Sequence, residues 1–154
     1  MRAVIQRVFN ASVVADGVPS GSIEKGLYIL LGVGKEDTEN DARLLSEKIA
    51  KLRIFSDENG KMNLSVNDID GEVLVVSNFT LCANYAHGNR PDYLAAAAPE
   101  DANRLYEYFV NDIKNKVKKC ATGKFGADMK TDMTTDGPVT IVMDSEVLTK
   151  KGKG

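Results

Sequence analysis

The polar residues behind a predicted buried strand are the part of this chain best suited to chemistry. Ser77, Asn78, Phe79 and Thr80 directly follow the apolar run at 73–76. If the strand continues through them, Ser77 and Phe79 share one face and their two neighbours share the other. Backbone N–H groups are free where strand pairing stops, and such groups stabilise a developing oxyanion. Polar residues also satisfy the end of a strand without any catalysis, and the pattern alone leaves both interpretations open.

The side chains that most hydrolases use are scarce. The only histidine, His87, lies in a polar loop without the glycine pattern of a nucleophile elbow. Cys82 and Cys120 are far apart and match no metal or redox spacing, so they read as small apolar residues. The segment Gly32-Val33-Gly34 lacks the third glycine of a dinucleotide site. We therefore expect no metal and no cofactor, and any hydrolysis has to depend on positioning and backbone dipoles.

The composition fits one compact cytoplasmic domain. A chain of 154 residues with 43% hydrophobic residues can bury a core without disulfides. Its longest apolar run, at 27–33, is too short to cross a membrane, and no apolar signal core follows Met1. We expect a single domain at 1–145 and a basic, disordered tail at 146–154.

The charge pattern leaves a contact with RNA open. The net charge is −2, so long-range attraction does not draw this chain onto RNA. A local patch remains a candidate and comprises Lys114, Lys116, Lys118, Lys119, Lys124 and Lys130. The same lysines also suit a solvated helix end, where cations complement the helix dipole.

Periodicity predicts mixed α and β structure (α+β). Helical spacing occurs at 38–52, which opens on Thr38 and Asp41 like a capping box, and at 99–119, which opens on a proline. Strand character occurs at 2–15, 27–33, 53–56, 72–81, 124–133 and 139–144, with turns at 16–17, 59–60 and 134–138. This order favours two helices that cover a mainly antiparallel sheet.

Two segments resemble the signatures of a known family. Ser77-Asn78-Phe79-Thr80-Leu81 and Gly137-Pro138-Val139-Thr140 are similar to the segments Ser-Gln-Phe-Thr-Leu and Asn-x-Gly-Pro-Val-Thr of the D-aminoacyl-tRNA deacylases. The likeness continues in the same order at 6–8, 11–13, 53–57, 60–64, 88–91, 122–125 and 127–129. Only the part beyond about Ser145 falls outside it.

The resemblance implies a homodimer with a deacylase-type fold, in which mainly antiparallel sheets form a barrel-like arrangement. It also implies that the Gly137-Pro138 bond is cis and reaches into the pocket of the partner subunit. The carbonyl oxygens there would accept hydrogen bonds from the α-ammonium of the aminoacyl group, so a D side chain points outward and an L side chain collides. Achiral glycine should pass this filter, including glycine mischarged on tRNA(Ala).

The implied reaction is hydrolysis of D-aminoacyl-tRNA to free D-amino acid and tRNA, a proofreading step of translation. The backbone N–H at Phe79 would support the oxyanion, while Ser77 and Thr80 would hold this segment and the 3′-terminal adenosine. Thr80 is also the one candidate nucleophile, although no base stands ready to activate it. The substrate's own 2′-OH is the other candidate for assistance. Support for the Gly-Pro segment would come from Thr135, Val139 and Thr140.

Two residues depart from the family pattern. Asn78 stands where the family usually has glutamine, and Thr135 stands where it usually has asparagine. These changes leave two alternatives: a relative with altered aminoacyl specificity, or a non-catalytic dimeric module that binds charged tRNA. The intact Phe79-Thr80-Leu81 and Gly137-Pro138-Val139-Thr140 favour ordinary D-specific deacylation.

Overall fold

The N-terminal hairpin begins the sheet that carries the rest of the molecule. The structure, a computed structural model, describes residues 1–150. Strand β1 (Arg2–Ala15) turns at Asp16 and Gly17, both with positive φ, into β2 (Val18–Ile23). Glycine adopts such a conformation without steric cost, which explains the tight turn. The predicted hairpin is therefore confirmed.

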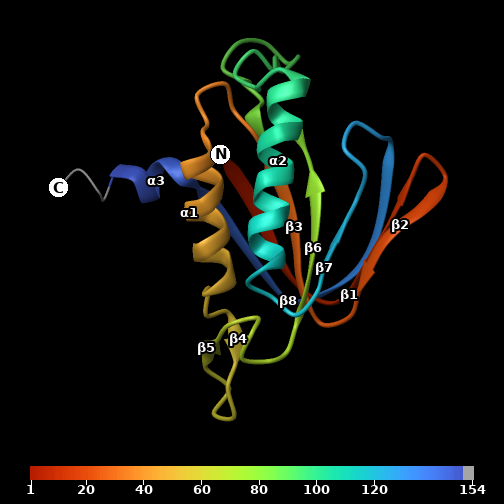
Figure 1. The fold of residues 1–154 in the computed structure, drawn as a ribbon, viewed down its shortest axis with the longest axis vertical. Helices are drawn as coiled ribbons and strands as arrows, with labels where there is room; N and C mark the ends of the chain where they lie inside the picture. Colours follow the sequence, from red (N-terminus) through yellow and green to blue (C-terminus); the bar gives the residue numbers. More distant parts are fainter. Residues whose placement is uncertain (151–154) are drawn as a thin grey trace.

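A six-stranded sheet curls into a nearly closed barrel (Figure 1). Its order is β2-β1-β3-β6-β7, and β8 pairs with the free edge of β1. The further strands are β3 (Gly26–Gly32), β6 (Glu72–Ser77), β7 (Cys120–Thr122) and β8 (Met129–Asp144). Pairing is antiparallel at β1 and parallel between β3, β6 and β7. The Ser20 hydroxyl donates to the Thr122 carbonyl at 3.0 Å, which draws β2 towards β7 and nearly closes the barrel.

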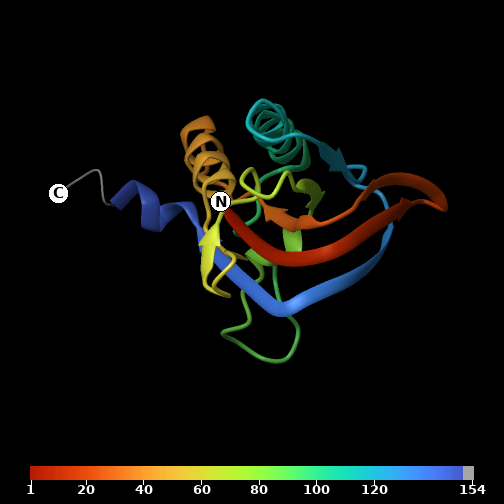
Figure 2. The ribbon, with the colours of Figure 1, turned by 90° about the horizontal axis from the view of Figure 1, so that it is seen from below.

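Two helices cover one side of this barrel, and β8 lies on the opposite side (Figure 2). They are α1 (Glu39–Ala50) and α2 (Pro99–Lys114), and both bury an apolar face against the sheet. Asp41 accepts a hydrogen bond from the Thr38 N–H at 2.9 Å, as the capping pattern predicted. The predicted α+β class is thus confirmed. A small hairpin of β4 (Phe55–Ser56) and β5 (Met62–Leu64) extends the end of the molecule where α1 finishes.

The C-terminal strand corrects the prediction of a turn at 134–138. Residues 129–144 form one strand, β8, and both of its halves pair with β1. The pairing slips in the middle, because Gln6 faces Thr140 while Val8 faces Thr135. The four residues 136–139 therefore bulge out opposite the single residue Arg7. Long-range pairing with β1 overrides the local Asp-Gly turn signal.

Further boundaries differ from the sequence prediction, and the strand expected from 124 begins only at Met129. The strand expected at 72–81 ends at Ser77, and a 3₁₀ turn, η1 (Phe79–Cys82), follows. The helix expected to reach Lys119 ends at Lys114. The tail expected to be disordered from 146 is helical at 146–150, within α3 (Ser145–Lys150), because the Ser145 hydroxyl bonds to Asp41 at 2.7 Å. Residues 151–154 of that tail lie outside the described part of the chain.

No helix within residues 1–150 has the length and apolar character needed to span a bilayer.

Candidate functional site

Turn η1 takes its shape from the residue that precedes it. Asn78 is the N-cap, and its side-chain oxygen accepts a hydrogen bond from the Thr80 N–H at 3.2 Å. The Thr80 hydroxyl donates to the same oxygen. Residues after Ser77 therefore turn instead of alternating across a strand, so the predicted pairing of faces at 77–80 is wrong.

This capping leaves one backbone donor without an acceptor. The N–H of Asn78 donates to the Leu31 carbonyl at 2.8 Å, and that of Leu81 donates to the Asn78 carbonyl. Within residues 1–150, the N–H of Phe79 has no hydrogen-bond acceptor. Phe79 as a residue is 59% exposed, so η1 lies at the surface of the molecule. A free N–H at the first position of a helical turn is suited to an anionic oxygen.

The end of β3 and the start of β1 hold η1 in place. A Cβ added at Gly32 would lie 3.0 Å from the Asn78 carbonyl oxygen, so glycine allows the turn to pack closely. Arg2 donates to the Leu81 carbonyl at 3.1 Å and to Asp144 at 3.1 Å. Burial opposes ionisation of Asp144, but the Glu146 N–H and Arg2 outweigh it and lower its pKa.

The second signature segment forms the bulge of β8. The Gly137-Pro138 bond is cis, as the resemblance implied, and both residues are exposed. Gly137 has φ +126°, and a Cβ there would lie 2.8 Å from the Val139 nitrogen. Thr135 and Thr140 flank the bulge, and the Thr140 hydroxyl donates to Gln6 at 2.8 Å.

A buried arginine holds the base of this bulge. Arg7 is 9% exposed and donates to the carbonyl oxygens of Ile54, at 2.8 Å, and Asp136, at 3.2 Å. It also forms an ion pair with the Asp136 carboxylate at 3.3 Å. Sequence reasoning did not single out Arg7 as a site residue. The available signal was a charged residue beside Ile5 and Val8, in a strand of otherwise buried apolar positions.

The two signature segments lie at different points along β1, one at its start and the other near its middle. Turn η1 touches Arg2, whereas the bulge lies against Arg7. Five residues of extended strand span about 17 Å. Within this chain the residues that hold η1 and the bulge are therefore well separated along β1.

Other titratable groups are poorly placed for catalysis. His87 lies in an exposed loop, and burial raises the pKa of both cysteine thiols, that of Cys120 to about 11. Within residues 1–150 no cluster of three His, Cys, Asp or Glu side chains has the arrangement of a metal site. A hollow of about 1080 Å³ lies behind η1, beside Arg2 and Cys82, but its lining includes none of residues 77–80. We regard it as separate from the candidate site.

Comparison with known proteins identifies the same segments as part of one family. A family model described as D-Tyr-tRNA(Tyr) deacylase matches residues 4–144. A protein of Thermosipho africanus named D-aminoacyl-tRNA deacylase is 56% identical over 146 residues, which cover 95% of this chain and 98% of the relative. A Clostridium botulinum protein of the same name is 53% identical over 145 residues, covering 94% and 97%.

Solved structures agree in fold. The structure of a c-Myc DNA unwinding element binding protein aligns with a TM-score of 0.88 at 39% identity, covering 94% of this chain and 98% of that one. A probable eukaryotic D-amino acid tRNA deacylase aligns with a TM-score of 0.78 at 14% identity, covering 92% and 97%, which shows the fold alone. The family match and the close relatives over nearly the whole length show that this chain belongs to the D-Tyr-tRNA(Tyr) deacylase family.

Proposed function

We propose that this protein hydrolyses the ester between a D-amino acid and the 3′-terminal adenosine of tRNA, as a cytoplasmic proofreading enzyme formed by residues 1–145. Water adds to the ester carbonyl, the bond to the ribose oxygen breaks, and that oxygen takes up a proton. The observation that carries the proposal is that the N–H of Phe79, a residue exposed at the surface, has no acceptor within residues 1–150. It is placed to stabilise the oxyanion, a contribution of about 3 kcal/mol for one well-aligned donor.

Chirality is selected by the bulge rather than by a side-chain pocket. The exposed Gly137-Pro138 segment presents backbone carbonyl oxygens, which accept hydrogen bonds from the α-ammonium of the substrate. An ammonium fixed there leaves room for a substituent on one side of Cα only. D-amino acids of many kinds are therefore substrates, and glycine mischarged on tRNA(Ala) is one as well.

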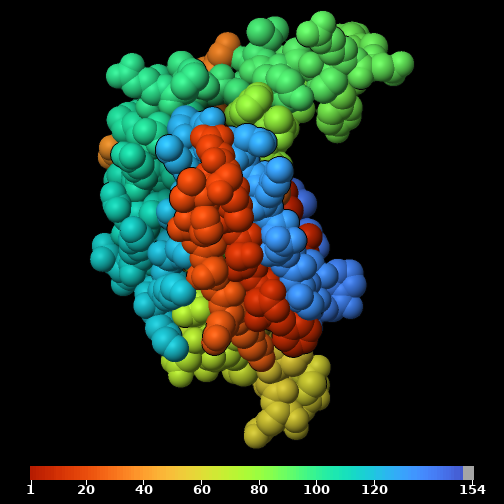
Figure 3. Space-filling model, turned by 90° about the vertical axis from the view of Figure 1, so that its right-hand side faces the viewer, coloured from red at the N-terminus to blue at the C-terminus, as the bar shows by residue number. Residues whose placement is uncertain are grey.

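A homodimer completes the site, because η1 lies at the start of β1 and the bulge lies near the middle of that strand. A two-fold axis across the outer face of β1 and β8 brings η1 of one subunit to the bulge of its partner. Two large apolar residues of this strand pair are exposed, Phe9 of β1 at 52% and Val142 of β8 at 72%. The loop at 84–96 projects beyond β8 on the same side (Figure 3). A partner subunit docked on this face would contact the loop. Both features support the dimer.

Assistance to the attacking water comes from the substrate. The Thr80 hydroxyl donates to Asn78, and within residues 1–150 no histidine or lysine contacts it to act as a base. The vicinal 2′-OH of the terminal ribose lies next to the reacting carbonyl and orients the water. Asn78 works as a cap for η1, so the shorter amide is compatible with catalysis.

The test compares D-tyrosyl-tRNA, L-tyrosyl-tRNA and D-tyrosyl-tRNA ending in 2′-deoxyadenosine. Rapid hydrolysis of the first alone, with normal binding but slow hydrolysis of the third, is expected. Hydrolysis of the L ester at a similar rate would refute the chirality filter. Tight binding of charged tRNA without any release would instead identify a binding module, and full turnover of the deoxy substrate would refute assistance by the 2′-OH.

A further inference from the structure

The lysines near the end of α2 differ in whether a carboxylate lies close to them. Lys116 pairs with Asp112 at 2.9 Å, and Lys119 lies 3.9 Å from Glu72 and donates to the Ser22 carbonyl. These two lysines are paired with carboxylates and connect α2 and the following segment to the rest of the fold. Lys114 and Lys124 are exposed and have no carboxylate partner within residues 1–150.

The two unpaired lysines line the same groove. It has a volume of about 370 Å³, and α2 forms one wall while residues 122–125 form the other. Asn103 and Asn111 add amide groups, and Glu107 is the one carboxylate in the lining. Two cations and two amides from two separate segments thus face one hollow with a net positive charge. Such a lining suits an anionic ligand.

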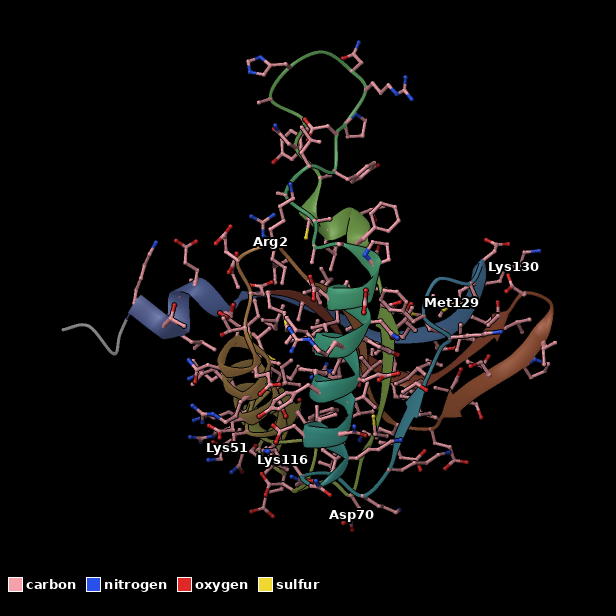
Figure 4. The ribbon with its side chains drawn as sticks, turned by 45° about the horizontal axis from the view of Figure 1, so that its top comes forward. Arg2, Lys51, Asp70, Lys116, Met129 and Lys130 are labelled. Atoms are coloured by element: carbon pink, nitrogen blue, oxygen red, sulfur yellow. The ribbon has the colours of Figure 1, made fainter. Side chains whose placement is uncertain are left out.

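The groove borders β6, the strand that leads into η1. The Val75 carbonyl accepts hydrogen bonds from the Gly123 N–H, at 3.1 Å, and from the Tyr106 hydroxyl, at 3.1 Å. Val75 precedes Ser77 by two residues, a distance of about 7 Å along the strand. The groove therefore begins beside the strand that leads into η1. In Figure 4, the labelled Lys116 lies at the far end of α2 and Lys130 lies away at the start of β8.

We propose that this groove binds the phosphates of the unpaired 3′ strand of the tRNA, just before the terminal adenosine, with Lys114 and Lys124 as the phosphate contacts. The inference rests on the proposed function, because that function places the 3′ end at η1. An acidic protein with a net charge of −2 needs such a local contact to hold RNA. The hollow beside Arg2 does not offer one, because Glu36 and Glu146 line it.

The first test measures binding of uncharged tRNA as a function of salt. The double variant Lys114→Gln/Lys124→Gln should bind about 10-fold more weakly, and the slope of log K against log salt should become shallower by about 1.4, the value for two lost single-strand contacts. Lys118→Gln is the matched control, since Lys118 is exposed and close in sequence but does not line the groove. Equal losses in the control, or an unchanged double variant, would overturn the proposal.

A second test locates the contact on the RNA. Against tRNA lacking the unpaired 3′ strand, the wild type and the double variant should bind alike. A loss that persists with the truncated RNA would place the lysines elsewhere on the tRNA and overturn the assignment. In deacylation, the double variant should raise KM about 10-fold and keep kcat. If the wild type releases no amino acid, the proposed function fails, while the binding measurements still decide the groove.

Discussion

Turn η1 and the β8 bulge are both exposed segments of the candidate site, but they are held in different ways. Asn78 shapes η1 through hydrogen bonds to residues within three positions of itself. The bulge has no such local network and depends on Arg7, which lies on another strand. The shape of η1 thus comes from local hydrogen bonds, with β3 and Arg2 holding the turn in place, whereas the bulge depends on a contact distant in sequence. We therefore expect activity to be sensitive to substitutions within η1 itself. For the bulge, we expect it to be sensitive also to substitution of Arg7, which is distant in sequence.

The largest loss of activity is expected when η1 loses the Phe79 N–H. Phe79→Pro removes the N–H proposed to hold the oxyanion, and proline is tolerated at a first helical position after an extended residue such as Asn78. Deacylation should fall by roughly 300-fold. Phe79→Ala, which keeps the N–H, is the control and should lose far less. Equal losses in the two variants would assign the role to the ring instead of the backbone.

The next prediction tests whether the two halves meet across subunits. Gly137→Ala places a Cβ against Val139 at φ +126° and should displace the bulge, which lowers activity by about 100-fold. Gly17→Ala also has positive φ but meets nothing within 4 Å, so it should cost stability alone.

Mixing two inactive variants then separates the possible arrangements. A heterodimer of Phe79→Pro with Gly137→Ala contains one site with both halves intact, so mixing and re-annealing should restore activity. Persistent inactivity of a verified heterodimer would place both halves in one subunit.

A third prediction compares the two arginines of β1, Arg2 at its start and Arg7 near its middle. Arg7→Met leaves the Asp136 and Ile54 carbonyls without their donor, and should lower the free energy of unfolding by about 2 kcal/mol and activity by about 30-fold. Arg2→Met should cost activity only about 3-fold, because η1 keeps its Asn78 cap. Enzyme assays and urea unfolding of the two variants decide the order. A larger loss from Arg2→Met would reverse the comparison.

Local signals in the sequence predicted much of the fold. Thr38 with Asp41 marked the start of α1, and Asp16-Gly17 marked the first turn. The same reasoning extended β6 too far, because Phe79 and Leu81 continue an apolar alternation. Asn78 held the missing signal, since an asparagine is a frequent N-cap and here turns the chain.

Local sequence patterns predicted only part of the candidate site. The Asp136-Gly137 pair is a strong local turn signal, yet β1 pairs on both sides of it and converts it into a bulge. Arg7 acts over a sequence separation of 129 residues, which no window of local pattern can detect. The family resemblance identified Gly137 and Pro138 and their neighbours Thr135, Val139 and Thr140, but the contact with Arg7 became apparent only from the fold.

A fourth prediction compares the effects of losing the Asn78 cap and of losing the Thr80 hydroxyl that donates to it. Asn78→Ala removes the acceptor for the Thr80 N–H and should cost about 1 kcal/mol of stability and about 10-fold in kcat, since the free Phe79 N–H loses its fixed direction. Thr80→Ala keeps the capped backbone and should retain activity within about 5-fold. Single-turnover kinetics of both variants give the comparison. A folded but inactive Thr80→Ala protein would make Thr80 the nucleophile.

The smallest predicted effect is on the free energy of unfolding at low pH. It involves the Asp144–Arg2 pair beside η1. The Asp144 carboxylate pairs with Arg2, and its pKa in the folded protein is lowered, because the Glu146 N–H and Arg2 outweigh the opposing effect of burial. A lowered folded pKa means that the stabilisation is complete above the unfolded value of about 3.9 and is lost as pH falls through the folded pKa. Unfolding free energy measured from pH 6 to pH 2.5 should therefore drop more for the wild type than for Asp144→Asn, and the two curves should converge in acid. Arg7→Met should leave this difference between the curves unchanged, because the pair it breaks lies near the middle of β1, about 17 Å along the strand from Arg2. Parallel curves for wild type and Asp144→Asn would show that the contact of Asp144 with Arg2 adds no pH-dependent stability.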